Sequence, residues 1–194
     1  MSKSDLVVLG FLMIKPMYGY EIIQFIKHRE LDIWAGIKMP SIYKALHRLE
    51  QKNLISGVQE IDGNNPPRTV YSLTPQGGDY FRKVLNFFLK SRDSSSQDFW
   101  LAISFLNRGI DRKSFLKIVQ NKISRLENHI DCHQQGLLQF QKEKRKNYIP
   151  FYIDILMEVG GKIHQIELEG MKKLYRQAAS GDFDEDFLQE MEEN

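Results

Sequence analysis

The sequence predicts a mainly α-helical protein with two domains, one over residues 1–92 and one over residues 93–194. Three observations support this prediction. The first half contains three helix-type stretches followed by two short strand-type stretches. A serine-rich segment at 91–97 is typical of a linker. The second half carries apolar residues at steps of three and four over long distances, as packed long helices do.

Composition limits the class of protein. Of the 194 residues, 42% are hydrophobic and 27% are charged, which is enough to bury a core in one or two small domains. No apolar run approaches the roughly 18 residues that span a bilayer, and the start lacks the pattern of a signal peptide. The single cysteine, Cys132, excludes an internal disulfide and a multi-cysteine zinc site. We therefore expect a cytoplasmic protein that is stabilised by packing.

The first 40 residues predict two helices and a connector. Residues 5–15 are apolar on nearly every side, which indicates a buried helix that Pro16 ends. A second helix is expected from Tyr18 to about Arg29. The segment 31–38, which contains Trp34, is expected to connect it to a third helix.

The third predicted helix begins at Pro40, where the missing amide hydrogen of proline costs nothing. Its two faces differ. The apolar face carries Ile42, Ala45, Leu46 and Leu49. The polar face carries Tyr43, Lys44, His47, Arg48 and Gln51. Asn53 follows as an expected left-handed helix cap.

A predicted hairpin follows this helix. Residues 54–61 and 68–73 are strand-type, and the Gly, Asn and Pro residues of 62–67 predict the turn between them. Thr74 is then expected to cap a helix from Pro75 to about Lys90. Three helices followed by a hairpin and a helix are the order of a winged helix-turn-helix domain, whose third helix enters the DNA major groove.

The charges favour the same assignment of the first half. Residues 1–90 contain twelve Lys and Arg against eight Asp and Glu, whereas residues 91–194 contain fifteen against seventeen. On the third helix, Arg48 could reach a guanine edge, and Lys44, Ser41 and Tyr43 could bind phosphate oxygens. The alternatives are that this face is simply solvated, or that the domain is a protein-interaction adaptor that does not bind DNA.

The second half predicts an antiparallel pair of long helices joined by a basic turn at 142–147. The expected seam on the first helix consists of Val119, Ile123, Leu126, Ile130, His133 and Leu137. The expected seam on the second consists of Tyr152, Leu156, Val159, Ile163, Ile166 and Leu174. Further apolar residues lie outside both seams, so we expect a homodimer formed mainly by this half. The alternative is that residues 99–106 and the first helix cover these residues internally.

No catalytic motif is found. GxGxxG, P-loop, GxSxG and HExxH patterns do not occur, so we expect neither an enzyme nor a cofactor. His129, Cys132 and His133 lie within about one helical turn and leave open a metal-responsive regulator. A solvated or seam position is the alternative for both histidines.

Two aromatic residues and a glycine pair complete the candidates. Trp34 and Trp100 are expected to be core anchors, with an effector-binding platform as the alternative. Gly160 and Gly161 lie inside a predicted helix, where each costs roughly 1 kcal/mol relative to alanine. Close helix packing or contact with a ligand would compensate for this cost.

Five sequence blocks resemble the PadR family of transcriptional regulators over residues 6–78. They are LGFL at 9–12, PMYGYE at 16–21, PSIYKALHRLE at 40–50, LI at 54–55 and RTVYSLTPQG at 68–77. The blocks occur in the order and spacing of the family. The helical remainder resembles the C-terminal dimerisation domain of the longer members.

The resemblance implies a dimeric repressor that binds an inverted-repeat operator in double-stranded DNA. In some members a small aromatic or drug-like effector, held near the dimer or domain junction, releases the DNA. The DNA-binding residues that the resemblance implies are Tyr18, Tyr20, Tyr43, Lys44, Arg48, Arg68 and Tyr71. The polar side of the third helix adds Ser41 and His47 as expected DNA-binding residues. Two positions depart from the family pattern. Asn53 replaces the usual glycine, and the tip at 64–67 lacks basic residues, so wing contacts would rest on Arg68 and backbone amides.

Overall fold

The computed structural model describes residues 1–60, 67–91, 96–106, 109–144 and 150–188. It contains two compact units, which are described separately. Unit 1 comprises Met1–Asp111 with Glu185–Asn194, and unit 2 comprises Arg112–Asp184. The chain is mainly helical with one small sheet, as the sequence predicts.

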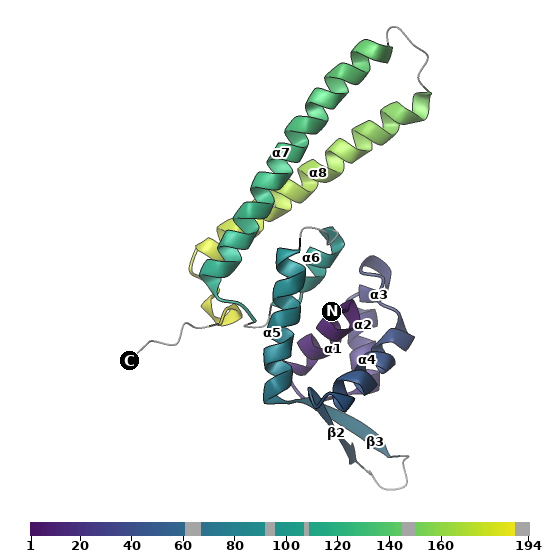
Figure 1. Ribbon diagram of the computed structural model, residues 1–194, viewed down its shortest axis with the longest axis vertical. Coiled ribbons are helices and arrows are strands. Elements are labelled where there is room, and N and C mark those ends of the chain that lie inside the picture. The colour runs from purple at the N-terminus through teal and green to yellow at the C-terminus, as the bar shows by residue number, and fades with distance from the viewer. Residues whose placement is uncertain (61–66, 92–95, 107–108, 145–149, 189–194) are drawn as a thin grey trace. The chain divides into compact units, whose positions relative to one another are not determined.

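Unit 1 is a winged-helix domain extended by one helix, α6 (Figure 1). In chain order its elements are α1 (Lys3–Leu12), β1 (Met17–Tyr18), α2 (Gly19–His28), α3 (Leu31–Trp34), α4 (Met39–Gln51), β2 (Ile55–Glu60), β3 (Arg68–Leu73), α5 (Pro75–Lys90) and α6 (Ser96–Ile103). The sequence predicts the order of the main elements. It does not predict β1, which has only two residues, or α3, which lies in the expected connector.

The core of unit 1 surrounds α1. Residues 4–12 of this helix are buried, and α1 packs against both α4 and α5. Phe105, just after α6, contacts Phe11 edge to face, with ring centroids 5.0 Å apart. A Cβ atom on Gly10 would lie 2.4 Å from the Phe105 ring, so Gly10 makes this contact possible. Residues 96–105, which the sequence assigns to the second domain, are thus part of unit 1. The domain boundary expected between residues 92 and 93 stays a prediction.

The sheet has the strand order β1-β3-β2, and both pairs are antiparallel. Tyr18 lies opposite Val70 in the first pair, and Glu60 lies opposite Arg68 in the second. Tyr18 and Glu60 therefore lie on the two outer strands, with β3 between them. Residues 61–66 of the predicted turn lie outside the described residues.

Local signals place the ends of α4 and α5. Asn53 has a φ of 54°, in the left-handed region, which confirms the predicted cap. The Asn53 N–H donates to Glu50 O and the Leu54 N–H donates to Leu49 O, so α4 ends in a Schellman motif. The Thr74 hydroxyl accepts a hydrogen bond from the Gly77 N–H at 3.0 Å, as expected of an N-cap.

Unit 2 consists of two long helices, α7 (Arg112–Lys144) and α8 (Phe151–Ala179), which pack against each other. The short helix η1 (Asp184–Asp186) follows α8 in the chain, and its last two residues belong to unit 1. The predicted seam of α7 is correct in that its residues are buried or half-buried. The linker residues 92–95 and the turn residues 145–149 lie outside the described residues.

The predicted seam of α8 is wrong. Five of its members are exposed: Tyr152, Leu156, Val159, Ile163 and Ile166. The less exposed face of α8 instead carries Ile153, Met157, Gly161, His164 and Met171. Because the less exposed face includes Gly161 and His164, it is less apolar than the exposed one, and apolar periodicity therefore picks out the exposed face. No helix in the described part of the chain combines the length and apolar character needed to cross a membrane.

Candidate nucleic-acid interface

The helix α4 separates its apolar and polar faces as the sequence predicts, except that Arg48, predicted on the exposed face, is half-buried and pairs with Asp5 of α1. Ile42, Ala45, Leu46 and Leu49 are buried against the rest of unit 1. Tyr43, Lys44, His47 and Gln51 are exposed. Among the described residues, no carboxylate pairs with Lys44. This face therefore offers an uncompensated ammonium group, a phenol and an imidazole to a partner in solution.

The wing carries a cluster of aromatic and charged side chains, which we call the wing cluster: Tyr18, Tyr20, Glu60 and Arg68. The rings of Tyr18 and Tyr20 are stacked, with centroids 5.3 Å apart. The Arg68 guanidinium lies over the Tyr20 ring, 5.6 Å from its centroid. Arg68 is exposed, so this stacking holds a cation in place at the surface.

The Tyr18 hydroxyl donates a hydrogen bond to the Glu60 carboxylate at 2.5 Å. This bond, with burial as a smaller cause, raises the pKa of the Tyr18 phenol above its ordinary value. The Tyr18 backbone N–H donates to the Glu21 carboxylate at 2.8 Å and so helps to begin α2. Tyr18 therefore joins β1 and the start of α2 to the outer strand, β2.

Gly19, at the centre of the YGY motif, lies in a contact between the start of α2, α4 and β3. A Cβ atom at Gly19 would lie 3.3 Å from Leu46, 3.6 Å from Tyr43 and 3.9 Å from Tyr71. The start of α2 thus packs closely against α4 and β3. Tyr71 is half-buried in this contact, and burial, followed by the charge of Glu50, raises the pKa of its phenol. Its predicted DNA contact stays a prediction.

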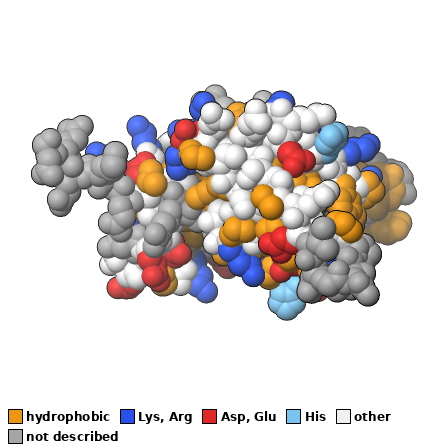
Figure 2. Space-filling model, turned by 90° about the horizontal axis from the view of Figure 1, so that it is seen from below, with side chains coloured by type: hydrophobic (Ala, Val, Ile, Leu, Met, Phe, Trp, Pro, Cys, Tyr) orange, Lys and Arg blue, Asp and Glu red, His pale blue; other side chains and the backbone are white. Residues whose placement is uncertain are grey.

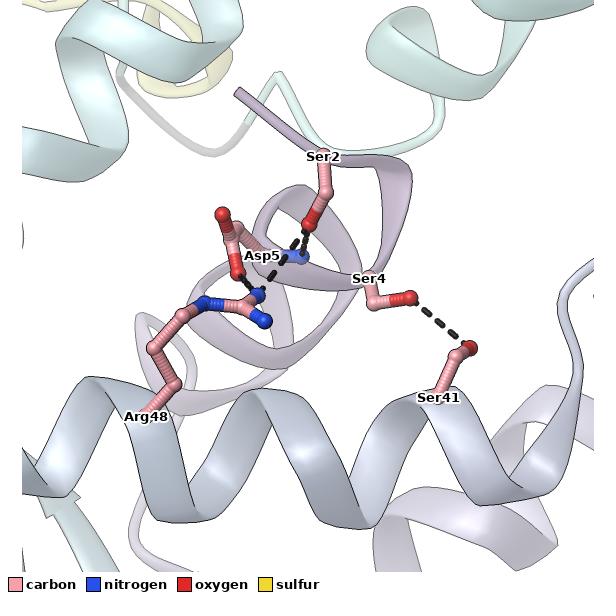
Figure 3. A network of polar contacts seen from close by, with 5 residues as sticks. All are labelled: Ser2, Ser4, Asp5, Ser41 and Arg48. Carbon is pink, nitrogen blue, oxygen red and sulfur yellow. Dashed lines mark hydrogen bonds and ion pairs between the residues drawn. The ribbon is translucent and has the colours of Figure 1, made fainter.

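Ser41 and Arg48, two predicted DNA-binding residues, lie on the side of α4 that faces α1 (Figure 3). The Ser41 hydroxyl donates to Lys38 O at 2.6 Å, and the Ser4 hydroxyl lies 2.8 Å from it. Arg48 pairs with the Asp5 carboxylate and donates to the Ser2 hydroxyl at 3.3 Å. The Asp5 side chain is only 6% exposed, whereas that of Arg48 is 42% exposed.

Sequence reasoning missed Ser2, Ser4, Asp5 and Glu60 as members of these networks. A signal for Asp5 exists, because a carboxylate in a helix that is apolar on nearly every side needs a partner. No sequence spacing connects it to Arg48, 43 residues away. Glu60 gives no such signal, since a glutamate at a strand end is ordinary.

The surface charges are mixed. Figure 2, which views the molecule from below relative to Figure 1, shows Lys and Arg side chains interspersed with carboxylates and apolar patches. This agrees with a net charge of only +2 for the chain. Attraction to a polyanion would therefore depend on particular cations such as Lys44 and Arg68.

The two tryptophans, predicted as core anchors or effector platforms, are both partly exposed. The Trp34 indole N–H donates to Arg29 O at 3.1 Å, and Trp100 packs edge to face on the buried Phe99. Each indole ring is thus held by a contact with a residue close to it in the chain, Trp34 by Arg29 and Trp100 by Phe99. An effector-binding role for Trp34 and Trp100 stays a prediction.

Three histidines meet between α7 and α8. The rings of His129 and His164 are stacked with centroids 5.0 Å apart, and His133 and His164 are 6.4 Å apart. A Cβ atom on Gly161 would lie 3.0 Å from the His133 ring, so this glycine permits the close helix approach that the sequence led us to expect. Within the described ranges, no group of three or more His, Cys, Asp or Glu side chains is placed to hold a metal ion.

A cavity of about 160 Å³ lies beside these histidines, between α7 and α8. Its lining includes Ile130, His133, Leu137, Met157, Gly161 and His164. The Nδ1 atom of His164 is buried and has no hydrogen-bond partner. Cys132, which the sequence groups with these histidines, is exposed.

Comparisons with known proteins point to PadR-type transcriptional regulators. Residues 8–83 match the family described as "Transcriptional regulator PadR-like family". A PadR family transcription regulator from Clostridium difficile, known from a crystal structure, is 31% identical; the match covers 45% of this chain and 99% of that one, with a TM-score of 0.36. A Lysinibacillus sphaericus protein described as "Uncharacterized protein X" is 30% identical over 81 residues, which cover 42% of this chain and 73% of that protein.

A longer match is weaker in sequence. The crystal structure of Bacillus subtilis PadR in complex with operator DNA is 16% identical, over 92% of this chain and 98% of that one, with a TM-score of 0.43.

Proposed function

Because the chain belongs to the PadR-like family of transcriptional regulators, we propose that it acts as a homodimer that binds a DNA operator through the outer face of α4. The observation that carries this proposal is the exposed set Tyr43, Lys44 and His47 on the third main helix of a winged-helix domain. In such domains this helix enters the major groove.

The chemistry of the exposed face fits this role. The Lys44 ammonium group has no carboxylate partner among the described residues, so it is available to a phosphate oxygen. The Tyr43 hydroxyl and the His47 ring can donate hydrogen bonds to phosphates or base edges. Arg68, stacked on Tyr20, presents a second cation at the wing.

Homodimer formation is supported by the outer face of α8. Exposed large apolar side chains follow this helix at steps of three and four: Tyr152, Ile155, Val159, Ile163 and Ile166. We call this set the α8 stripe. A continuous apolar stripe on one helix matches the seam of a helix-helix interface. A second copy would cover the stripe by a two-fold contact, which needs only one surface on each chain.

Two such copies would present two α4 helices. Successive major-groove faces of DNA are about 34 Å apart, so the dimer would bind an inverted repeat with half-sites one helical turn apart. A dimer bound over a promoter would block transcription, and we propose a repressor on this ground. Release by a small effector is the remaining part of the proposal, with the partly exposed Trp34 and Trp100 as candidate contacts.

The direct test uses labelled duplexes from the region upstream of the gene itself. Fluorescence anisotropy at 50 and 200 mM salt should show an affinity that falls by at least about tenfold, because phosphate contacts release counterions. An absence of binding to any such duplex, or a salt-independent affinity, would contradict the proposal. Sedimentation equilibrium of the free protein tests the dimer separately.

A further inference from the structure

The recognition helix α4 is fastened to the first turn of α1 by polar contacts at two positions (Figure 3). Near the start of α4, the Ser4 and Ser41 hydroxyls are 2.8 Å apart. Two helical turns later, Arg48 pairs with Asp5 and donates to Ser2. Ser2 is also the N-cap of α1, since its hydroxyl accepts from the Asp5 N–H at 3.1 Å.

Asp5 is buried, so its carboxylate needs a charged or hydrogen-bonded partner. The Asp5 side chain is 6% exposed, and a carboxylate removed from water without a charged or hydrogen-bonded partner is strongly disfavoured. Arg48 supplies that partner. Nearby Tyr80 on α5 responds to both charges: burial raises the pKa of its phenol, Asp5 raises it further and Arg48 opposes the rise.

The same contact uses one of the three nitrogens of the Arg48 guanidinium. One nitrogen, Nη2, serves both Asp5 and Ser2, and the carboxylate neutralises the positive charge. A bidentate contact to a guanine uses Nη2 together with Nη1 or Nε, so Arg48 would have to give up one of these two bonds before reading a guanine in this way. Lys44, one turn earlier, has no such obligation.

We propose that Arg48 is a positioning residue, which holds α4 at a fixed angle on α1 by its bond to Asp5 and does not itself contact DNA. Asp5 and Ser2 act in the same unit, although they lie at the start of the chain and outside the recognition helix. This inference rests on the proposed function, because it assigns roles within the DNA-binding site. It replaces the expected base-reading role of Arg48 with a structural one.

The first experiment separates positioning from phosphate contact. The salt dependence of operator binding is measured for wild type, Arg48→Gln and Lys44→Gln. Loss of one phosphate contact lowers the slope of log K against log salt by about 0.9. We expect this change for Lys44→Gln and an unchanged slope, with weaker binding, for Arg48→Gln. A slope lowered by about 0.9 in Arg48→Gln would overturn the proposal.

The second experiment separates positioning from base reading. Binding is compared on the operator and on duplexes that each carry one changed base pair. Arg48→Gln should weaken binding by the same factor on every duplex, and Arg48→Lys should restore much of the affinity, because lysine can still pair with Asp5. Relaxed discrimination at one base pair, or a failure of Arg48→Lys to recover affinity in a folded protein, would contradict the assignment.

The third experiment does not involve DNA, so its failure is distinct from a failure of the proposed function. Urea unfolding is measured for wild type, Asp5→Asn, Arg48→Gln and the double variant. The two side chains form one contact, so removing the second costs nothing once the first is gone. The free energy of unfolding of the double variant should therefore be no lower than that of the less stable single variant. Additive effects would show that the contact is absent. If the single variants do not fold, Ser4→Ala, Ser41→Ala and their double variant provide a milder set. Ser41→Ala should cost more than Ser4→Ala, because it also removes the bond to Lys38 O. A double variant no less stable than Ser41→Ala supports the fastening of α4, and additive effects contradict it.

Discussion

The Tyr18 hydroxyl and the Glu60 carboxylate are 2.5 Å apart, so β1 is linked to β2 across the middle strand β3. This hydrogen bond favours the protonated phenol and raises the pKa of Tyr18. The contribution of this hydrogen bond to the free energy of unfolding is complete below the ordinary phenol pKa of about 10. It is lost as the pH rises through the higher pKa of the folded state. Glu60→Gln should therefore lower the pKa of Tyr18. The pKa of Tyr18 is measured by following tyrosinate absorbance against pH in wild type and in Glu60→Gln, after subtracting the same titration of a Tyr18→Phe variant of each. Identical Tyr18 titration curves in the two proteins would contradict the hydrogen bond.

Gly77 is expected to tolerate no side chain. A Cβ atom there would lie 1.9 Å from the backbone oxygen of Leu54, and backbone cannot move aside as a flexible side chain can. Gly77→Ala should destabilise unit 1 by about 2 kcal/mol or more, as overpacking does. Gly78→Ala is the matched control, because its Cβ would meet only Leu73 at 3.9 Å. Urea unfolding that ranks the two variants equally would refute this account of the turn into α5.

Two residues with left-handed backbone offer a stabilising change. Glu30 and Asn53 have φ values of 53° and 54°, where an L-residue other than glycine is disfavoured by roughly 1 to 2 kcal/mol. Glu30→Gly should raise the melting temperature. Asn53→Gly should raise it less, because asparagine already tolerates this conformation. Differential scanning calorimetry distinguishes the two, and a lower melting temperature for Glu30→Gly would count against the backbone assignment.

Ile163 lies in the α8 stripe and is 57% exposed in the single chain. If a second copy covers it, Ile163→Glu buries an unpaired carboxylate on each side of the interface. This should weaken the dimer by about 100-fold or more. Ile33→Glu changes an exposed isoleucine on α3 and should leave the dimer intact. Sedimentation equilibrium gives both results, and an Ile163→Glu protein that dimerises as wild type does would remove the α8 stripe from the interface.

Lys44 is the cation on which the DNA-binding proposal depends most. Lys44→Gln removes a charge from the exposed face of α4 and should weaken DNA binding at 50 mM salt more than at 200 mM salt. Lys83→Gln removes a charge from α5 that is also exposed, and serves as the control. Anisotropy titrations of both variants measure the difference. Equal affinities for the two variants would place the DNA elsewhere.

Much of unit 1 could be predicted because its signals are local. Pro40, Asn53 and Thr74 mark helix ends by backbone chemistry that does not depend on the rest of the fold. The contact between Asp5 and Arg48 could not be predicted, because it forms only after α1 and α4 pack together. The orientation of α8 was predicted incorrectly, since the face toward α7 includes Gly161 and His164 and is less apolar than the exposed face. The packing of Gly161 against His133 shows which face of the helix lies toward α7.

The most direct test of the central claim is a selection of bound duplexes from a random DNA pool with the purified protein. Two α4 helices in a two-fold dimer predict enrichment of an inverted repeat whose half-site centres are about 10 base pairs apart. The Lys44→Gln protein should enrich the same sequence less strongly. A pool that remains random after repeated selection, or an enriched single site without a repeat, would contradict the account.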